Sequence, residues 1–197
     1  MKENDYHFQN DTLKDTITAY AEKILLKKIR YDDSFDFSKV HSDLKQTFLS
    51  GNYFIEKKDK TDASLFEKEL GYKLPQDIEE YLNSYWHPGI FGYDKFYEYE
   101  CICLLGVIKY ENENADDVLF NKKGIVHLAR LWRDDFGGNV NEYLPIGYLG
   151  YSGNVVLYEV KTGRIFMEDF DNDGEPEKEP FENSLQELIQ HLEPIMP

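Results

Sequence analysis

The sequence predicts an α+β fold, in which an antiparallel β-sheet carries packed helices and a helical extension precedes it. Three observations predict it: two helical stripes joined by a Leu-Pro step at Leu74-Pro75, strand-like stretches that follow without alternating helices, and a capped helix near the end. We expect an N-terminal helical accessory segment over residues 1–60 and an α+β domain over residues 61–197. Together they should form one compact unit.

The first sixty residues show one clear helix. Residues 1–10 should be frayed, as chain ends commonly are. Asp11 or Thr12 should cap a helix, because apolar residues follow at helical spacing, namely Leu13, Ile17, Tyr20, Ala21 and Ile24. Residues 40–49 fit a short helix and residues 53–56 a short strand.

Residues 61–86 predict two consecutive helices. Thr61 or Asp62 should cap the first, and Gly71 should end it in the left-handed conformation that glycine accepts. Pro75 suits the first position of the second helix, where a missing N–H costs nothing. An apolar stripe runs along that helix, made of Ile78, Tyr81, Leu82 and Tyr85. The tripeptide of residues 87–89, His-Pro-Gly, should stop it.

Strands should follow. Residues 96–108 fit one strand or two, and Cys101 and Cys103 should point to the same face of it; a disulfide between them would be strained. Residues 125–132 fit either a strand or a helical turn, and residues 134–138 fit a loop. The acidic run of residues 111–123 has no assigned element.

A hairpin within residues 144–169 should lie at the centre. Residues 155–160 form its first strand, Gly163 suits the turn, and residues 165–170 return. Both faces are largely apolar, so other elements should cover both sides. Ser184 and Glu187 form a capping box that opens a last helix, ended by Pro194. One core should bury four of these apolar side chains, Leu157, Tyr158, Phe166 and Leu188.

The charge is strongly acidic and unevenly placed. The chain holds 22 Lys and Arg against 38 Asp and Glu, a net charge of −16, and residues 1–60 are balanced, so the whole excess lies in residues 61–197. Such a surface repels nucleic acid and anionic membranes and favours a basic protein partner. No apolar run is long enough to span a bilayer. Without a secretory signal or a disulfide framework, we expect a cytoplasmic protein.

Catalytic motifs are weak. Gly150-Tyr151-Ser152-Gly153 is one residue short of a nucleophile elbow, and it precedes a strand rather than following one. The glycines at 147, 150 and 153 do not match a phosphate-binding loop. No histidine pairs with another at metal-ligand spacing, as the positions of His7, His41, His87, His127 and His191 show. We therefore expect neither catalytic residues nor a cofactor.

An acidic stretch after the hairpin resembles half of a calcium loop. Residues 169–174 match D-x-D-x-D-G, but the twelfth position is Pro180 instead of glutamate, and a strand rather than a helix enters the loop. An acidic turn is the favoured interpretation. A weak cation site made of Asp169, Asp171 and Asp173 stays open.

Three segments carry a resemblance to a known family. Residues 66–86 (FEKELGYKLPQDIEEYLNSYW), residues 144–169 (LPIGYLGYSGNVVLYEVKTGRIFMED) and residues 184–194 (SLQELIQHLEP) resemble the SUKH superfamily, which includes a yeast cell-wall-synthesis regulator, bacterial immunity proteins and the Syd protein. The last segment, and more weakly residues 13–23, resemble the Syd branch. The resemblance spans about residues 62–193 and implies an antiparallel sheet with packed helices.

The resemblance also implies a function, which is partner recognition through one sheet face and its loops. The first expectation is an immunity protein that neutralises a basic bacterial toxin domain. The alternative is a Syd-like regulator that binds basic cytoplasmic loops of the SecY translocon, and a further alternative is a weak calcium-binding protein. The expected partner-binding residues are Glu98, Glu100, Asp134, Asp135, Glu142, Glu168, Asp169 and Asp171, with Trp86 and Trp132 as aromatic anchors.

Overall fold

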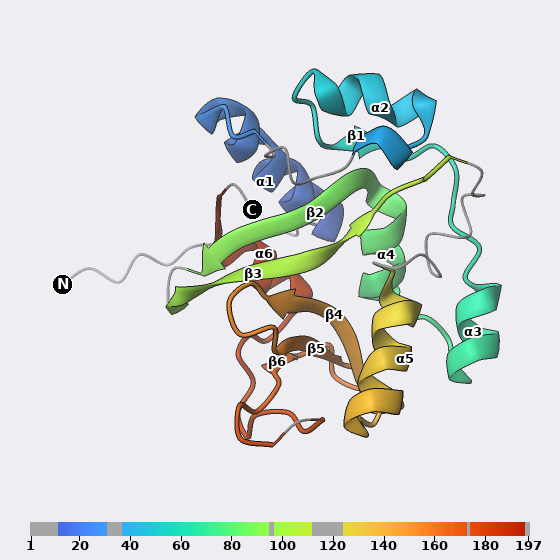
Figure 1. Ribbon diagram of the computed structural model, residues 1–197, viewed down its shortest axis with the longest axis vertical. Helices are drawn as coiled ribbons and strands as arrows, with labels where there is room; N and C mark the ends of the chain where they lie inside the picture. The colour runs from blue at the N-terminus through green and yellow to red at the C-terminus, as the bar shows by residue number, and fades with distance from the viewer. Residues whose placement is uncertain (1–11, 31–36, 95–96, 112–123, 173, 196–197) are drawn as a thin grey trace.

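An antiparallel β-sheet with helices packed on it forms the centre of the computed structural model, which describes residues 12–30, 37–94, 97–111, 124–172 and 174–195 (Figure 1). The α+β prediction is confirmed. The expected frayed residues 1–10 and most of the unassigned run after Glu111 lie outside the described residues. In chain order the helices and strands are α1 (Leu13–Lys27), a 3-10 turn (Phe37–Lys39), α2 (Ser42–Leu49), β1 (Ile55–Glu56), α3 (Ser64–Leu70), α4 (Gln76–Ser84), β2 (Tyr85–Asp94), β3 (Tyr97–Val107), α5 (Ile125–Phe136), β4 (Tyr143–Leu149), β5 (Val155–Glu159), β6 (Ile165–Met167), α6 (Leu185–His191) and β7 (Leu192–Pro194).

The sheet follows the order of the chain. Within the described residues, neighbouring strands pair in the order β1-β2-β3-β4-β5-β6, all antiparallel. The short strand β7 returns to the outer edge of β2, where Asp94 pairs with Leu192. Consecutive strands are therefore sheet neighbours, and the central strands are supported on both sides.

The helices pack in two groups. Helix α1 contacts α4 and α6, and α6 contacts β2; α1 and α6 lie behind β2 and β3 in Figure 1. Helix α5 packs against β4, and α3 contacts α5. The buried side chains of both groups and of the sheet belong to one hydrophobic core. In it Leu157, Tyr158, Phe166 and Leu188 are all buried, as the sequence predicts.

Tyr20 of α1 completes the outer edge of β2. On this edge β1 pairs with residues 85–86 and β7 with residues 92–94, so among the described residues no strand pairs with the outer edge of the stretch between them. The Tyr20 hydroxyl fills this gap: it donates to the Phe91 carbonyl at 2.7 Å and accepts from the Phe91 N–H at 3.0 Å. The N-terminal helix is thus bonded directly to the sheet.

Several predicted helix ends are confirmed because their signals are local. Thr12 caps α1 in a reciprocal pair with Asp15. Gly71 ends α3 at φ 80°, and the Ser184 hydroxyl accepts the Glu187 N–H at 3.0 Å. Cys101 and Cys103 share one face of β3, as predicted, with their sulfur atoms 3.7 Å apart.

Two predicted boundaries are wrong. Residues 134–138 are not all loop, because α5 runs through Asp134 and Asp135 to Phe136 and ends at Gly137, whose φ is 76°. Burial of Val126, Ala129 and Trp132 along one face explains the helix. Residues 87–89 do not stop the second helix, because α4 already ends at Ser84 and residues 87–89 lie within β2. A proline is tolerated there because β2 has no strand on that stretch of its outer edge.

The hairpin and the last helix are shorter than predicted. Strand β6 ends at Met167 instead of Phe170, because the Glu168 side chain turns into the protein interior. Helix α6 ends at His191, since Leu192 already pairs with β2 as part of β7. Tertiary pairing therefore overrides the local helical pattern at Leu192.

His87 is a buried titratable group in β2. Its ring is fully enclosed, stacked on Phe54 at 5.3 Å and set edge-on to Tyr81 at 5.2 Å between ring centroids. Burial, and to a smaller extent the nearby Lys57 charge, lower its pKa from 6.5 to about 3, while a backbone hydrogen bond at Gly89 opposes the shift. The imidazole is therefore neutral in the folded protein at neutral pH.

We expect Phe166→Ala to lower the free energy of unfolding by about 3–5 kcal/mol, because it opens a cavity in a closed core. Phe166 is 4% exposed and lies edge-on to Tyr143 at 5.5 Å. Urea denaturation measures the change. A loss below about 1 kcal/mol would mean that this side of the hairpin is not part of the core.

His87 should make the protein acid-sensitive. Between pH 6.5 and pH 3 the unfolded chain takes up a proton that the folded core excludes, so stability falls as the pH decreases. From pH 7 to pH 5 the wild type should lose about 2 kcal/mol more than His87→Phe, which has no proton to take up. Denaturation curves at both pH values give the difference, and parallel losses would contradict it.

Candidate functional site

The candidate functional site is an acidic corner at the lower end of Figure 1, where the C-terminal end of α5 meets the loop after β6. Gly174 of this loop lies against the backbone of Phe136 and Gly138, so close that a Cβ on it would come within 2.2 Å of the Phe136 carbonyl oxygen. The acidic corner, as we use the term, consists of acidic residues that are exposed, except for the half-exposed Asp169. They are Asp134, Asp135, Glu142, Asp169, Asp171, Glu175, Glu177 and Glu179.

Two carboxylates of the corner act on the neighbouring Tyr143 side chain. The pKa of Tyr143 is raised mainly by burial and then by the carboxylates of Glu159, Glu142 and Glu175, while Arg164 opposes the shift. Glu142 and Glu175, 33 positions apart in the sequence, therefore lie near the same ring. Separate segments of the chain therefore contribute to this corner.

The buried Glu168 carboxylate connects the segments that form the corner. It is 6% exposed, and one oxygen accepts the Trp132 indole N–H at 2.8 Å and the Gly174 N–H at 2.9 Å. The other oxygen accepts the Val155 N–H at 3.1 Å. One carboxylate thus joins α5, the acidic loop and β5.

This arrangement corrects two of the predicted partner residues. Glu168 and Trp132 were expected on the binding surface, but Trp132 is 1% exposed and its N–H is bonded to Glu168. Helical periodicity places Trp132 on the buried face of α5, and Glu168 follows the last β6 residue, where the chain turns inward. Both support the corner instead of facing a partner.

Asp169, the first residue of the predicted weak cation site, bonds within its own loop. The two oxygens of Asp169 accept the Asp171 N–H at 2.8 Å and the Asn172 side-chain N–H at 3.2 Å. The Asp171 backbone bond is the main cause of the lowered pKa of Asp169. Asp169 is thus bonded within its own loop, while Asp173, the third proposed ligand, lies outside the described residues.

The remaining predicted residues lie apart from this cluster. Glu100 accepts the backbone N–H and hydroxyl of Ser152 at 3.1 and 2.9 Å, so it fixes the turn between β4 and β5. Trp86 is half-buried in β2 with the Lys57 ammonium 4.0 Å from its ring centroid. The Glu98 side chain lies outside the described part of the structure.

Two exposed aromatic side chains belong to the corner and were missed from the sequence. Phe136 ends α5 with 49% of its surface exposed, and Phe170 follows Asp169 with 51% exposed. The sequence could have predicted their exposure. Each phenylalanine lies among acidic and loop-forming residues, without the periodic apolar neighbours that indicate a buried face. They, rather than the tryptophans, are the apolar groups that this surface presents.

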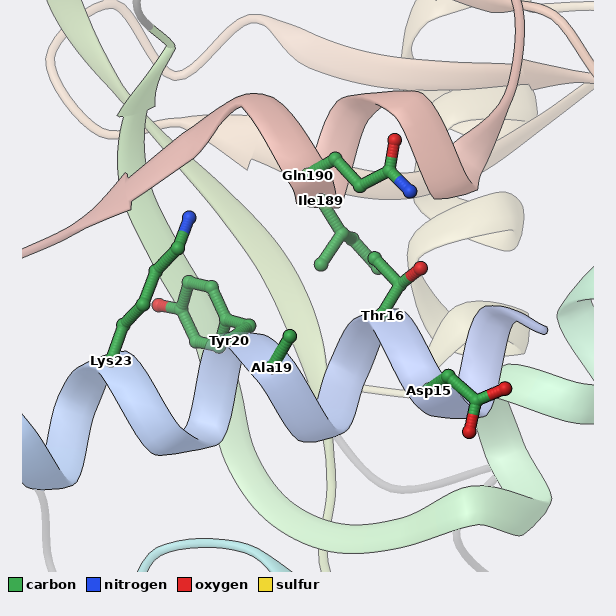
Figure 2. Close-up of a pocket in the computed structure, with 7 residues that line it drawn as sticks. All are labelled: Asp15, Thr16, Ala19, Tyr20, Lys23, Ile189 and Gln190. Atoms are coloured by element: carbon green, nitrogen blue, oxygen red, sulfur yellow. The ribbon is translucent and has the colours of Figure 1, made fainter. Parts of the chain in front are cut away.

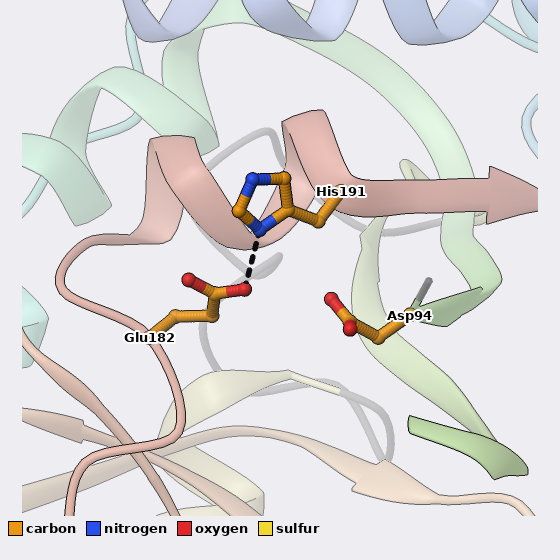
Figure 3. Close-up of side chains that lie close together, drawn as sticks. All are labelled: Asp94, Glu182 and His191. Carbon is orange, nitrogen blue, oxygen red and sulfur yellow. Dashed lines mark hydrogen bonds and ion pairs between the residues drawn. The ribbon is translucent and has the colours of Figure 1, made fainter. Parts of the chain in front are cut away.

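A second group of titratable side chains lies inside the protein, where Asp94, Glu182 and His191 meet (Figure 3). His191 Nδ1 lies 2.5 Å from a Glu182 oxygen. Burial raises the pKa of Glu182, the hydrogen bond and charge of His191 oppose the shift, and the Asp94 charge adds to it. Sequence spacing did not predict this group, because its members come from three separate elements.

A shallow pocket of about 120 Å³ lies between α1 and α6 (Figure 2). Its lining mixes the aliphatic Ile189 with polar side chains, and Lys23 reaches the Leu192 carbonyl at 3.5 Å. Asp15 on its rim is already bonded to the Thr12 cap. The lining brings together no acid-base pair or nucleophile with an activating base.

No family model matches the chain, and no curated protein sequence matches it. In the part of the chain that the structure describes, no helix is both long and apolar enough to cross a membrane.

Replacing Glu168 by glutamine should lower the free energy of unfolding by about 2–4 kcal/mol, because a neutral amide accepts fewer of the three N–H bonds and turns N–H groups toward donors. Urea denaturation measures the loss. The matched control is Glu177→Gln, an exposed member of the same corner, which should change stability by less than about 0.5 kcal/mol. Equal effects of the two variants would contradict a supporting role for Glu168.

Proposed function

We propose that this chain is a non-enzymatic binding protein whose acidic corner docks on a basic protein surface. One observation carries the proposal: exposed carboxylates from three segments and the exposed rings of Phe136 and Phe170 occur together on a corner held by the buried Glu168. A rigid, charged surface with apolar centres is what a protein interface requires.

The two kinds of side chain have different tasks. Exposed carboxylates steer a basic partner and raise the association rate, but each contributes little to the affinity, since water and salt screen it. Phe136 and Phe170 supply apolar area that the partner covers, and this slows dissociation. Arg130 and Arg133 lie near Asp134, and Arg133 is paired with it at 2.7 Å, while Lys178 lies near Asp169. Negative charge still predominates, because the carboxylates of the corner outnumber these cations.

The role we infer is that of an immunity protein with a SUKH-like fold that covers a basic bacterial toxin domain. What supports the fold assignment is the element order: α3, the Leu74-Pro75 step and α4 precede the antiparallel sheet, and α6 follows it. What supports the role is charge, because toxins that cleave nucleic acid are usually basic and an acidic inhibitor binds them fast.

A Syd-like regulator of the SecY translocon would use the same corner on basic loops, so capture from the native host must separate the two. The immobilised chain is exposed to host lysate and to solubilised membranes, and retained proteins are quantified by mass spectrometry. A basic toxin domain supports immunity, whereas translocon subunits support the regulator. If every protein retained by the wild type is also retained by Asp134→Lys/Asp135→Lys, the corner is not the binding surface.

With a captured partner, Asp134→Lys/Asp135→Lys should slow association by about tenfold at low salt, because it reverses two steering charges. Raising the salt should slow the wild type toward the rate of the variant. Stopped-flow mixing measures both rates. Folding should be unaffected, since both side chains are exposed.

The matched control for this experiment is Glu22→Lys/Asp43→Lys, which changes the net charge equally on exposed positions of α1 and α2. These helices lie at the opposite end of Figure 1 from the corner. An equal loss of rate in the control would show that overall charge, and not the corner, directs the partner.

A further inference from the structure

The backbone holds three metal-ligating side chains at one interior point (Figure 3). Asp94 ends β2 and pairs with Leu192, and His191 immediately precedes Leu192. Glu182 precedes α6 and is bonded to Ile165 of β6 through both its N–H and its carbonyl, at 3.2 and 2.9 Å. The positions of the three side chains are therefore set by sheet pairing and not by a free loop.

The spacing suits one small cation. One ligand atom from each residue can be chosen so that all lie within 4.8 Å of one another. Zinc holds nitrogen and oxygen ligands at about 2.0–2.2 Å, so tetrahedral neighbours are about 3.4 Å apart. Closing from 4.8 Å to that spacing takes at most about 1.4 Å, which side-chain rotation provides.

The charge balance also favours a cation. Asp94 is fully buried and Glu182 is 8% exposed, so two carboxylates lie close together away from water. Buried charges are costly unless they are paired or coordinate a metal. A divalent ion would bring two positive charges to a point where two carboxylate side chains meet.

We propose that Asp94, Glu182 and His191 bind a divalent transition-metal ion of the zinc class, linking α6 and β7 to β2 and β6. One imidazole nitrogen and two carboxylate oxygens match zinc better than calcium or magnesium, which prefer ligand sets made of oxygen alone. Three protein ligands leave a coordination position for water, and the exposed part of His191, 24% of its side chain, gives the ion a route in. This proposal is independent of the acidic corner.

Zinc chloride titrated into chelator-treated full-length protein tests it. We expect one tightly bound zinc ion per chain by calorimetry and a higher melting temperature, because an ion that binds only the folded state stabilises it. Calcium and magnesium chloride should leave the melting temperature unchanged at equal concentration. Absence of stoichiometric zinc binding would overturn the proposal.

Variants locate the ion. His191→Gln and Asp94→Asn should each lower the zinc affinity by at least about 100-fold, since even the outer partners of metal ligands contribute about 10–100-fold. The matched control is His127→Gln on α5, a half-exposed histidine outside the group, which should bind zinc like the wild type. Loss of binding in the control alone, or wild-type affinity in both ligand variants, would place the ion elsewhere.

A measurement on the unmodified protein covers the case in which a variant does not fold. Cobalt(II) in place of zinc should give a visible spectrum of nitrogen and oxygen ligation without a thiolate charge-transfer band. The neighbouring sulfurs of Cys101 and Cys103 are a competing site within the described residues, since thiolates bind zinc well. A thiolate band would assign the metal to the cysteines and overturn the proposal.

Discussion

The buried Glu168 carboxylate is the interaction on which the exposed surface depends. It accepts N–H groups from Trp132, Val155 and Gly174, and so ties a helix, a strand and a loop together. Each charged bond contributes about 1.5–3 kcal/mol, and ordering each loop residue costs about 1–2 kcal/mol. Only the Gly174 bond lies in the acidic loop, so the loop also depends on backbone bonds of its own, such as the one from the Asp169 N–H to the Glu175 carbonyl at 2.9 Å.

Acidic residues of this chain serve three different purposes that net charge does not separate. Glu168 satisfies backbone and indole N–H groups, Asp94 and Glu182 form the buried group with His191, and Asp134 belongs to the exposed corner. The net charge of −16 counts all of these carboxylates equally. Only the exposed class acts at long range, because a carboxylate enclosed by donors is compensated locally.

The sequence predicted those features that depend on interactions between residues close together in the chain. Thr12, Gly71 and Ser184 act within one helical turn, so their helix ends are readable without any structure. Trp132 and Leu192 were misjudged because their environments are set by distant segments, the acidic loop for one and β2 for the other. The group of Asp94, Glu182 and His191 depends on strand register, which local spacing does not contain.

The sheet edges explain why recognition should rest on side chains. Tyr20 closes the gap on the outer edge of β2 between β1 and β7, so that edge presents no continuous row of open backbone groups. At the other edge, Ile165 of β6 bonds to Glu182, and the Met167 carbonyl accepts the Glu177 N–H at 2.8 Å. At both places the backbone groups of the edge are already bonded. This disfavours binding by strand addition, which needs a free edge. The same segment that covers β6, residues 176–182, continues the acidic loop, so protection of the edge and presentation of charge come from one stretch of chain. A partner would therefore meet carboxylates and phenylalanine rings before it met an open strand.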